Sequence, residues 1–274
     1  MAQDLSIEYT DNVVFITMRT IGSRLWFVNN PELHEKILAH LAKYQEQYGF
    51  TLYAFIIMGN HYHMLAHFPQ PNRSAFLRAF DSIIARLTAK YVSSFEDGSL
   101  WGRRPKVQVV PNNEDILHTF KYTVLNPVSS GLCQKLSEFN SYNCLNDALS
   151  GVSQKYRLVD WADYDNRKRY NKELRPKDCE NEYTLTFSRL PGYEKLSQPK
   201  YAEKIRGEVE ERRLQLVAER IKEKQGFGDK KSLRGIRAGA KPKHNKTSSR
   251  DSKRPLVLTL CAETREKFTE MYFA

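Results

Sequence analysis

The chain of 274 residues is long enough for one domain of ordinary size with extensions, and its 41% hydrophobic and 12% aromatic residues indicate a folded core. Its 43 Lys and Arg residues outnumber its 32 Asp and Glu residues, and the net charge of +11 favours a polyanionic partner. The 4 cysteines form no C-x-x-C pair, so neither a zinc ribbon nor a disulfide framework is predicted.

The cysteines and the apolar segments also bear on the compartment. Free thiols in a chain of this length suggest a reducing environment. The start, from Met1 to Asp4, lacks the basic flank and apolar core of a signal peptide, and no apolar run approaches ~18 residues. We therefore expect a cytoplasmic protein without a membrane partner.

The chain begins with the pattern of a strand followed by a helix. Residues 13–19 are rich in β-branched and aromatic side chains, which predicts the first strand. Asn30 and Pro31 are typical of a helix start, apolar residues then recur at helical spacing over 32–48, and Gly49 is a typical stop. An amphipathic helix is expected there.

A β-hairpin is predicted next. Residues 52–58 are almost entirely apolar, which suits a central strand covered on at least one face. Gly59 and Asn60 form a natural two-residue turn, after which residues 61–68 return as a second strand. The two strands should pair, with His61 opening the returning strand.

A second helix and a fourth strand follow. Apolar residues at helical spacing over 76–91 predict the helix, and Asn72 or Ser74 is its expected N-cap. Residues 107–110 alternate in the manner of a strand.

The third helix completes a recognisable order of elements. Asn112 or Asn113 should cap it, and Pro127 should interrupt or end it, since a proline disfavours helical geometry in the residue before it. The order β-α-β-β-α-β, followed by a helix, is that of the split βαβ, or ferredoxin-like, arrangement. We therefore predict an α+β fold with an antiparallel sheet.

The composition and the periodicity of the sequence change after about residue 150. We predict a catalytic domain over 1–150, an accessory helical extension over 151–229 and a basic tail with a short terminal element over 230–274. The extension contains a charged helix over 201–224, whereas 156–183 shows no clear periodicity. The run from 230 to 254 is typical of a solvated, mobile tail that binds phosphates, and 256–260 could form one short strand or helix.

Two histidines in the returning strand are candidate metal ligands. Alternate side chains of a strand leave on the same face, so His61 and His63 point together while Tyr62 and Met64 point the other way. Two imidazoles on one face can share a metal ion. The structural alternative is that one is a hydrogen-bonded interior histidine and the other is there by chance, and His67 on the same face is read as structural.

The third helix offers a second group of candidates. Residues four apart lie on one face of a helix, so Tyr122 and Asn126 should point the same way, with His118 one turn earlier. Two imidazoles and one amide oxygen would suit Mn²⁺ or Mg²⁺ and offer no thiolate to select Zn²⁺. A phenol with a pKa of ~10 needs activation before it can attack, for which Lys121 or His118 is a candidate helper. Alternatively, Tyr122 is an ordinary aromatic of the core or surface.

Two segments carry a family resemblance. Residues 59–65, GNHYHML, and 121–132, KYTVLNPVSSGL, are similar to the paired motifs of the single-tyrosine HUH transposases of the IS200-like superfamily. They most resemble the branch called REP-associated tyrosine transposases, which pairs an N-H-x-H-[LM] strand with a later Y-x-x-x-N-P-V-x-x-G helix. Thr17 with Arg19, and the segment 100–104, also fit. The resemblance covers roughly residues 13–150.

The resemblance implies a fold, a chemistry and site residues. It implies the HUH endonuclease fold, with His61, His63 and Asn126 as ligands of Mg²⁺ or Mn²⁺ and Tyr122 as the nucleophile. The implied reaction is cleavage of single-stranded DNA at hairpin-forming, REP-like sites, with a 5′-phosphotyrosine intermediate and a free 3′-OH that can rejoin the strand. The covalent bond conserves the phosphodiester energy, so no ATP is implied.

The sequence departs from the family pattern at two places. Ser129 and Ser130 stand where the family often has Arg-Ala, and Pro105 follows Arg104 where an aromatic residue is usual. These changes affect expected phosphate contacts or DNA specificity and leave the cleavage residues intact.

Two other functions compete with a tyrosine transposase. One is a domesticated regulator that binds nucleic acid without cleaving it, which would need none of the metal ligands. The other is a metal-dependent RNase or phosphodiesterase with water as the nucleophile, which would form no covalent adduct.

The expected partner is single-stranded or hairpin DNA, bound by a monomer or homodimer. The basic tail should add salt-sensitive, non-specific affinity. The basic residues that flank the predicted site, and that we expect to contact DNA, are Arg19, Arg24, Arg103, Arg104, Lys106 and the candidate helper Lys121.

Overall fold

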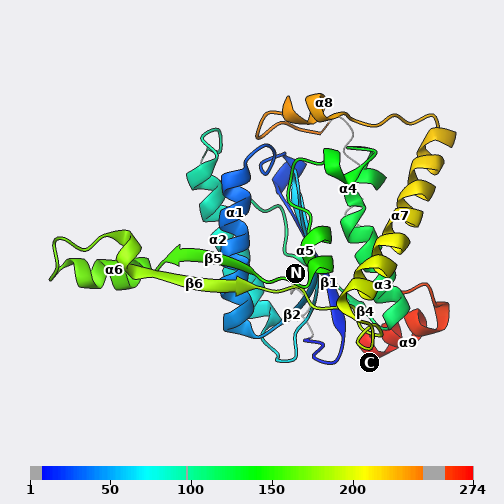
Figure 1. The fold of residues 1–274 in the computed structure, drawn as a ribbon, viewed down its shortest axis with the longest axis horizontal. Helices are drawn as coiled ribbons and strands as arrows, with labels where there is room; N and C mark the ends of the chain where they lie inside the picture. Colours follow the sequence, from blue (N-terminus) through cyan, green and yellow to red (C-terminus); the bar gives the residue numbers. More distant parts are fainter. Residues whose placement is uncertain (1–7, 97, 243–256, 274) are drawn as a thin grey trace.

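A four-stranded antiparallel sheet forms the centre of the protein (Figure 1). The computed structural model describes residues 8–96, 98–242 and 257–273, with backbone alone for 271–273. The strand order is β2-β3-β1-β4, and all three pairs of neighbours are antiparallel. The strands are β1 (Val13–Arg19), β2 (Thr51–Met58), β3 (His61–His67) and β4 (Lys106–Val110). This confirms the α+β, split βαβ architecture predicted from the sequence.

The helices α1 (Pro31–Tyr48) and α2 (Arg73–Tyr91) cover one face of the sheet. Tyr62 of β3 and Phe55 of β2 contact Phe80 of α2 on this face. The start of α1 is as predicted, because the Asn30 side chain accepts a hydrogen bond from the Leu33 amide.

The start of α2 uses a different cap from the predicted one. Asn72 occupies the N-cap position, but its side-chain amide donates to the Tyr48 carbonyl instead of capping the helix. The Glu8 carboxylate accepts from the Ser74 amide at 3.0 Å and takes over that role. A carboxylate at a helix N-terminus also interacts favourably with the helix dipole.

The helix α3 (Asn113–Val124) contacts β2 and β3 and lies on the sheet face opposite α1 and α2. Asn112 caps it by accepting from the Asp115 amide at 2.9 Å. The helix stops at Leu125, and a separate short helix, α4 (Asn126–Ser129), follows with Pro127 in its first turn. The prediction that Tyr122 and Asn126 share one continuous helix is therefore wrong, because Leu125, with φ −93° and ψ 5°, interrupts the helix between them.

Beyond the sheet domain, the chain forms an arm that the sequence pattern did not predict. Short helices η2 (Leu136–Glu138) and α5 (Leu145–Ser150) lead into an antiparallel pair, β5 (Gln154–Val159) and β6 (Glu180–Leu185). The arm projects from the body in Figure 1, and its tip carries α6 (Trp161–Lys168) and η3 (Pro176–Cys179). The base of the arm is tied to α1, since Glu46 accepts from the Thr184 amide at 2.6 Å.

The remaining segments return to the body. The predicted charged helix is α7 (Gln198–Lys222), and it is followed by α8 (Lys230–Arg234). Val257 bridges to Val109 at the β4 edge, whereas Leu256 lies outside the described residues. The last helix, α9 (Ala262–Phe273), and the one-turn η1 (Ile21–Ser23) were not predicted. Within the described residues, no helix is long and apolar enough to span a membrane.

A buried carboxyl group joins α2 to the sheet. The Tyr62 hydroxyl donates to Asp81 Oδ1 at 2.7 Å, and burial raises the pKa of Asp81 to about 7 despite that hydrogen bond. The Asp81 carboxyl has a higher pKa in the folded state than in the unfolded state, so the folded state binds the proton more tightly. Protonation of Asp81 therefore stabilises the fold at low pH. That contribution is lost as the pH rises from about 4 through about 7.

We expect Asp81→Asn to remove this dependence, because the amide keeps an acceptor for Tyr62 but does not ionise. The free energy of unfolding of the variant, minus that of the unmodified protein, should rise between pH 5 and pH 8 by on the order of 3 kcal/mol. Urea unfolding at intervals across this range measures the difference. The effect of the buried histidines on the pH dependence cancels in the difference, because both proteins contain them. Parallel stability curves would contradict the assignment to Asp81.

Candidate active site

His61 and His63 lie side by side at the start of β3. The register of β3 against β1 pairs His61 with Arg19 and His63 with Thr17. Both imidazoles are buried, and their Nε2 atoms face each other at 3.1 Å. The alternation of the strand therefore brings two lone-pair nitrogens to a single point.

The other ring nitrogen of each histidine is held by a neighbouring polar side chain. Asn60 Oδ1 accepts from His61 Nδ1 at 2.6 Å, and the Asn60 amide is oriented by its own donation to the Ser23 carbonyl. Thr17 Oγ1 bonds His63 Nδ1 at 2.8 Å. A hydrogen bond at Nδ1 leaves Nε2 as the metal-binding nitrogen. The sequence pattern predicts Asn60 as a turn residue and as part of the N-H-x-H motif, and the structure adds its hydrogen bond to His61.

The surroundings of the histidines keep them neutral. Burial lowers the pKa of His63 to about 3, with further contributions from Arg19 and Lys106. Burial, His63 and Arg19 hold the pKa of His61 well below its ordinary value. A neutral imidazole is the form that binds a metal ion, so both residues are in the competent state at pH 7.

Asn126 reaches the same point from α4. Its Nδ2 lies 3.3 Å from His63 Nε2, and its Oδ1 accepts from the Ser130 hydroxyl at 3.3 Å. Asn126 is 5% exposed, so its amide is enclosed with the two imidazoles. Ligation by the amide oxygen would require the opposite orientation of the amide, in which Oδ1 takes the place of Nδ2.

These three residues fit a divalent cation of the Mg²⁺ or Mn²⁺ type. They supply two neutral imidazoles and one amide oxygen, which leaves further coordination positions for phosphate oxygens and water. Among the described residues, no group of three or more His, Cys, Asp and Glu side chains could hold a metal ion. The proposed ligand set needs the Asn126 amide as its third member. The hydrogen bonds at both Nδ1 atoms support the two histidines as ligands, because they leave each Nε2 atom available.

Tyr122 lies over the histidines from α3. Its ring is 5.7 Å from the His63 ring and 5.8 Å from the Phe15 ring, with an edge-to-face geometry to both. Phe15 also stacks on His63. Tyr122 is 47% exposed, although its neighbours are buried. The phenol ring therefore lies at the rim of the candidate metal site and is open to solvent.

The two predicted helpers have other surroundings. Lys121 Nζ forms an ion pair with Glu208 Oε2 of α7 at 2.8 Å. The His118 side chain is accessible to solvent, and the desolvation of part of its ring, together with the charges of Lys121 and Arg212, lowers its pKa. No local pattern in the sequence predicts the connection of α3 to α7, since Lys121 and Glu208 are 87 residues apart.

Arg220 of α7 holds the segment that carries Asn126. Its Nη1 donates to the Ser129 carbonyl at 3.3 Å, and its Nη2 donates to the Gly226 carbonyl at 2.9 Å. The guanidinium lies against Gly131, where an added Cβ would be 2.1 Å from Nη2. Gly131 has φ +71°, which a glycine adopts without strain, so both its conformation and its lack of a side chain permit this contact.

The predicted DNA-contacting residues lie around the same end of the sheet. Arg19 is paired with His61, and Lys106 is paired with Thr17. The Gly102 amide donates to the Arg19 carbonyl, which brings the exposed Arg103 and Arg104 close to it in the chain. Arg24, another predicted DNA contact, is exposed and donates to the Gly239 carbonyl at 3.1 Å.

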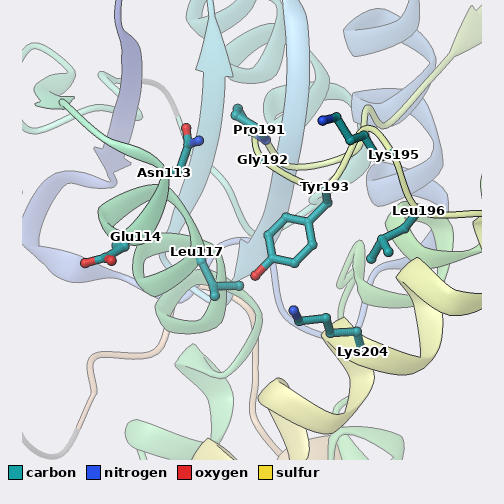
Figure 2. A pocket seen from close by; sticks show the side chains of 9 residues that line it. All are labelled: Asn113, Glu114, Leu117, Pro191, Gly192, Tyr193, Lys195, Leu196 and Lys204. Atoms are coloured by element: carbon teal, nitrogen blue, oxygen red, sulfur yellow. The ribbon is translucent and has the colours of Figure 1, made fainter.

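A separate open pocket of about 400 Å³ lies at the other end of α3 (Figure 2). Its lining includes Asn113 and Leu117 of α3, Tyr193 of the loop before α7, and Lys204 of α7. The Tyr193 ring lies between Leu117 and Lys204 in the figure. Asn113 is nine residues before Tyr122, or roughly 13 Å along the helix, so this pocket is distinct from the histidine site.

Comparisons with known proteins bear on the sheet domain. Residues 15–123 match the family described as "Transposase IS200 like". Among solved structures, a REP-associated tyrosine transposase bound to a REP hairpin is 17% identical, with a TM-score of 0.45 over 53% of this chain and 84% of that chain. A search of curated proteins found no match.

The matched segment contains β2, β3, β4 and most of β1, together with both histidines and Tyr122, and it ends shortly before Asn126. The helix α7, the arm and the segments after them lie outside it. Residues 15–123 are therefore similar to the IS200-like transposase family, and this similarity covers less than half of the chain.

Proposed function

We propose that the protein is a metal-dependent endonuclease and strand transferase that cuts single-stranded DNA beside a hairpin, with Tyr122 as the nucleophile. The observation that carries this proposal is the convergence of two imidazole Nε2 atoms 3.1 Å apart, the Asn126 amide and the Tyr122 ring. These groups come from β3, α4 and α3, so their meeting is a product of the fold.

The chain's residues have distinct parts in the reaction. His61, His63 and Asn126 would hold Mg²⁺ or Mn²⁺, which when bound supplies Lewis-acid polarisation of the scissile phosphate. Asn60 and Thr17 orient the two imidazoles. Tyr122 is exposed enough to meet a phosphodiester in an extended strand.

The covalent step exchanges one phosphate ester for another. The Tyr122 phenolic oxygen attacks the phosphorus and gives up its proton to solvent or to a base such as His118. The bond from phosphorus to the 3′ oxygen breaks, and that oxygen takes up a proton to become a free 3′-OH. A later attack by a 3′-OH on the phosphotyrosine reverses the exchange and rejoins the DNA without ATP.

The choice of a DNA hairpin rests on the family and on charge. The solved relative is described as bound to a REP hairpin. In this chain, Arg19 and Lys106 adjoin the histidines, while Arg24, Arg103 and Arg104 are exposed at the same end of the sheet. Such residues suit contacts to phosphates on both sides of the cleaved bond.

Tyr122→Phe should abolish the covalent adduct between the protein and DNA, because phenylalanine keeps the ring contacts but lacks the attacking oxygen. A labelled hairpin oligonucleotide with single-stranded flanks and Mn²⁺, analysed on a denaturing gel, measures this.

Tyr170→Phe is a suitable control for the adduct assay, since Tyr170 is 92% exposed on the arm, and this variant should form the adduct normally. Cleavage by the Tyr122→Phe protein would reject Tyr122 as the nucleophile. Hairpin binding by the unmodified protein with no adduct would favour a non-cleaving regulator.

Removal of divalent metal with a chelator should stop adduct formation, and His63→Ala should lower the affinity for Mn²⁺ because one ligand is lost. Titration calorimetry with Mn²⁺ alone reports this independently of cleavage. The matched control is His67→Ala, since His67 lies in the same strand as His63 but bonds the carbonyl of Thr10 and is no candidate ligand. Equal Mn²⁺ affinity in the two variants would contradict the assigned site.

Thr17→Val should weaken Mn²⁺ binding by about tenfold while leaving the strand intact, because valine fits a β-strand but cannot hold His63 Nδ1. Calorimetry with Mn²⁺ measures the affinity, and thermal unfolding verifies the fold. An unchanged affinity would show that Thr17 does not orient the ligand.

A further inference from the structure

Residues 226–242, here called the strap, lie outside the matched family domain and pack on the body of the protein. The sequence had predicted a mobile tail from 230 onward, of which 243–254 lie outside the described residues. In Figure 1 the strap (orange) leaves the end of α7 and crosses one end of the molecule. The Gly228 amide donates to the Gly131 carbonyl at its start.

The central part of the strap is held by Asn29. The Asn29 side-chain amide lies 2.8 to 3.1 Å from three strap carbonyls, those of Leu233, Arg234 and Ile236. These carbonyls include the last ones of α8, which lack partners within the helix. Leu233 is buried, so an apolar anchor accompanies the hydrogen bonds.

The end of the strap pairs with the loop that follows β1. The Leu25 amide donates to the Ala240 carbonyl at 2.9 Å, and the Gly239 amide donates to the Leu25 carbonyl at 3.0 Å. Gly239 has φ +79° and lies so close to Trp26 that an added Cβ would be 2.6 Å from the indole. The contact therefore requires glycine for its backbone conformation and for space.

The same loop connects the strap to the candidate active site. The Phe27 amide donates to the Gly59 carbonyl, and the Thr20 amide donates to the Asn60 carbonyl, next to His61. The Ile21 amide donates to the Leu100 carbonyl, close to Arg103 and Arg104. Backbone contacts thus run without interruption from the histidines to the strap.

The strap adds positive charge to a surface that is already basic. It contains one acidic residue, Asp229, whose side chain caps α8 through the Ser232 amide. Its exposed basic residues are Lys230, Lys231, Arg234, Arg237 and Lys241. Like charges within a Debye length repel each other, and here backbone hydrogen bonds and apolar contacts hold them together. A polyanion relieves that repulsion.

We infer that the docked strap is a DNA-binding surface that holds the phosphate backbone of the substrate where the DNA passes the β1–β3 end of the sheet. This inference rests on the proposed function for its choice of DNA. A docked strap differs from a mobile basic tail, because its affinity for DNA depends on the docking contacts as well as on its charge.

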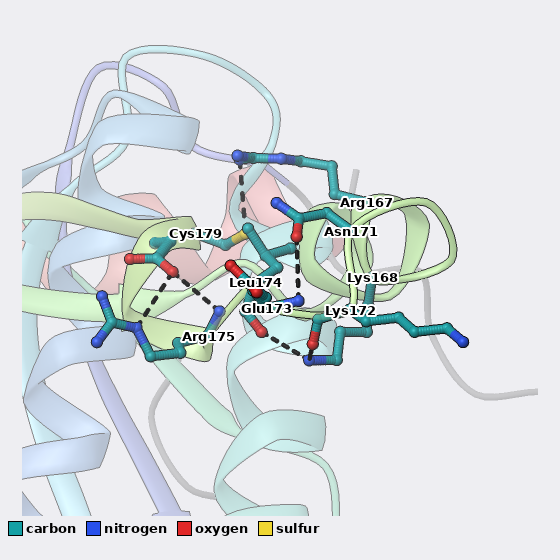
Figure 3. Close-up of polar contacts among 9 residues, drawn as sticks. Arg167, Lys168, Asn171, Lys172, Glu173, Leu174, Arg175 and Cys179 are labelled. Atoms are coloured by element: carbon teal, nitrogen blue, oxygen red, sulfur yellow. Dashed lines mark hydrogen bonds and ion pairs between the residues drawn. The ribbon is translucent and has the colours of Figure 1, made fainter.

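Two kinds of variant separate docking from charge. Gly239→Val and Asn29→Ala each remove a docking contact and retain every basic residue. Arg237→Gln combined with Lys241→Gln removes two charges from the strap. The matched control is Arg169→Gln with Lys172→Gln, which removes one arginine and one lysine from the exposed tip of the arm, where Figure 3 shows Lys172.

The full chain is titrated with a fluorescent DNA hairpin carrying single-stranded flanks, without divalent metal, over a range of salt concentrations. The logarithm of the binding constant falls linearly with the logarithm of the salt concentration, and each lost phosphate contact reduces the steepness of that line by about 0.9 for duplex DNA. The strap double variant should therefore lose up to about 1.8 of the slope and bind roughly tenfold or more weakly near 0.1 M salt. The arm double variant should bind like the unmodified protein.

Limited trypsin cleavage within the strap reports docking directly. Gly239→Val and Asn29→Ala should be cut faster than the unmodified protein and should show a loss of DNA affinity similar to that of the strap double variant. Bound DNA should slow the cleavage of the unmodified protein, because binding and docking favour each other.

Three results would overturn the inference. They are unchanged trypsin cleavage in both docking variants, unchanged affinity in a variant whose strap is released, and equal binding by the strap and arm double variants. The assay needs neither metal nor Tyr122, so a failure of the proposed cleavage chemistry would appear as a missing adduct with the strap results unaffected.

Discussion

The pairing of β1 with β3 is the constraint on which the rest of the site depends. It sets Thr17 beside His63 and Arg19 beside His61, and it directs both imidazoles to the face covered by α3. A shift of one residue would turn them toward α1 and α2, because successive side chains of a strand alternate between faces. On that opposite face Tyr62 binds the buried Asp81, which gives the register a second anchor.

The electrostatics of the site suit an anionic substrate. The candidate ligands His61, His63 and Asn126 carry no negative charge, while Arg19 and Lys106 are close enough to lower the pKa of His63. A divalent cation would therefore add positive charge to a positive environment. In the proposed reaction, the phosphodiester of the DNA strand would supply the missing negative charge, so metal and DNA would favour each other's binding. This contrasts with carboxylate-rich sites, which hold cations without a substrate.

The part of the chain beyond the matched family domain supports the site from outside. Glu208 pairs with Lys121 next to Tyr122, the proposed nucleophile, and Arg220 holds the segment that carries Asn126. The strap then joins the end of α7 to the loop beside the β2–β3 turn. The additional residues therefore bear on the geometry of Tyr122 and Asn126 and on the charge around them, although their own sequence contains no catalytic motif.

The sequence by itself determined the features that local patterns encode. Alternation placed His61 and His63 on one face, Gly59 and Asn60 predicted the turn, and Asn30 and Asn112 predicted two helix starts.

Only the tertiary structure decided how distant segments meet. Asn126 reaches the histidines across a break in the helix, and β5 pairs with β6 across the intervening residues 160–179, which lack a shared periodicity. Asn29 holds a strap more than 200 residues away. Periodicity and capping act over a few neighbouring residues, whereas these contacts depend on the packing of the whole chain.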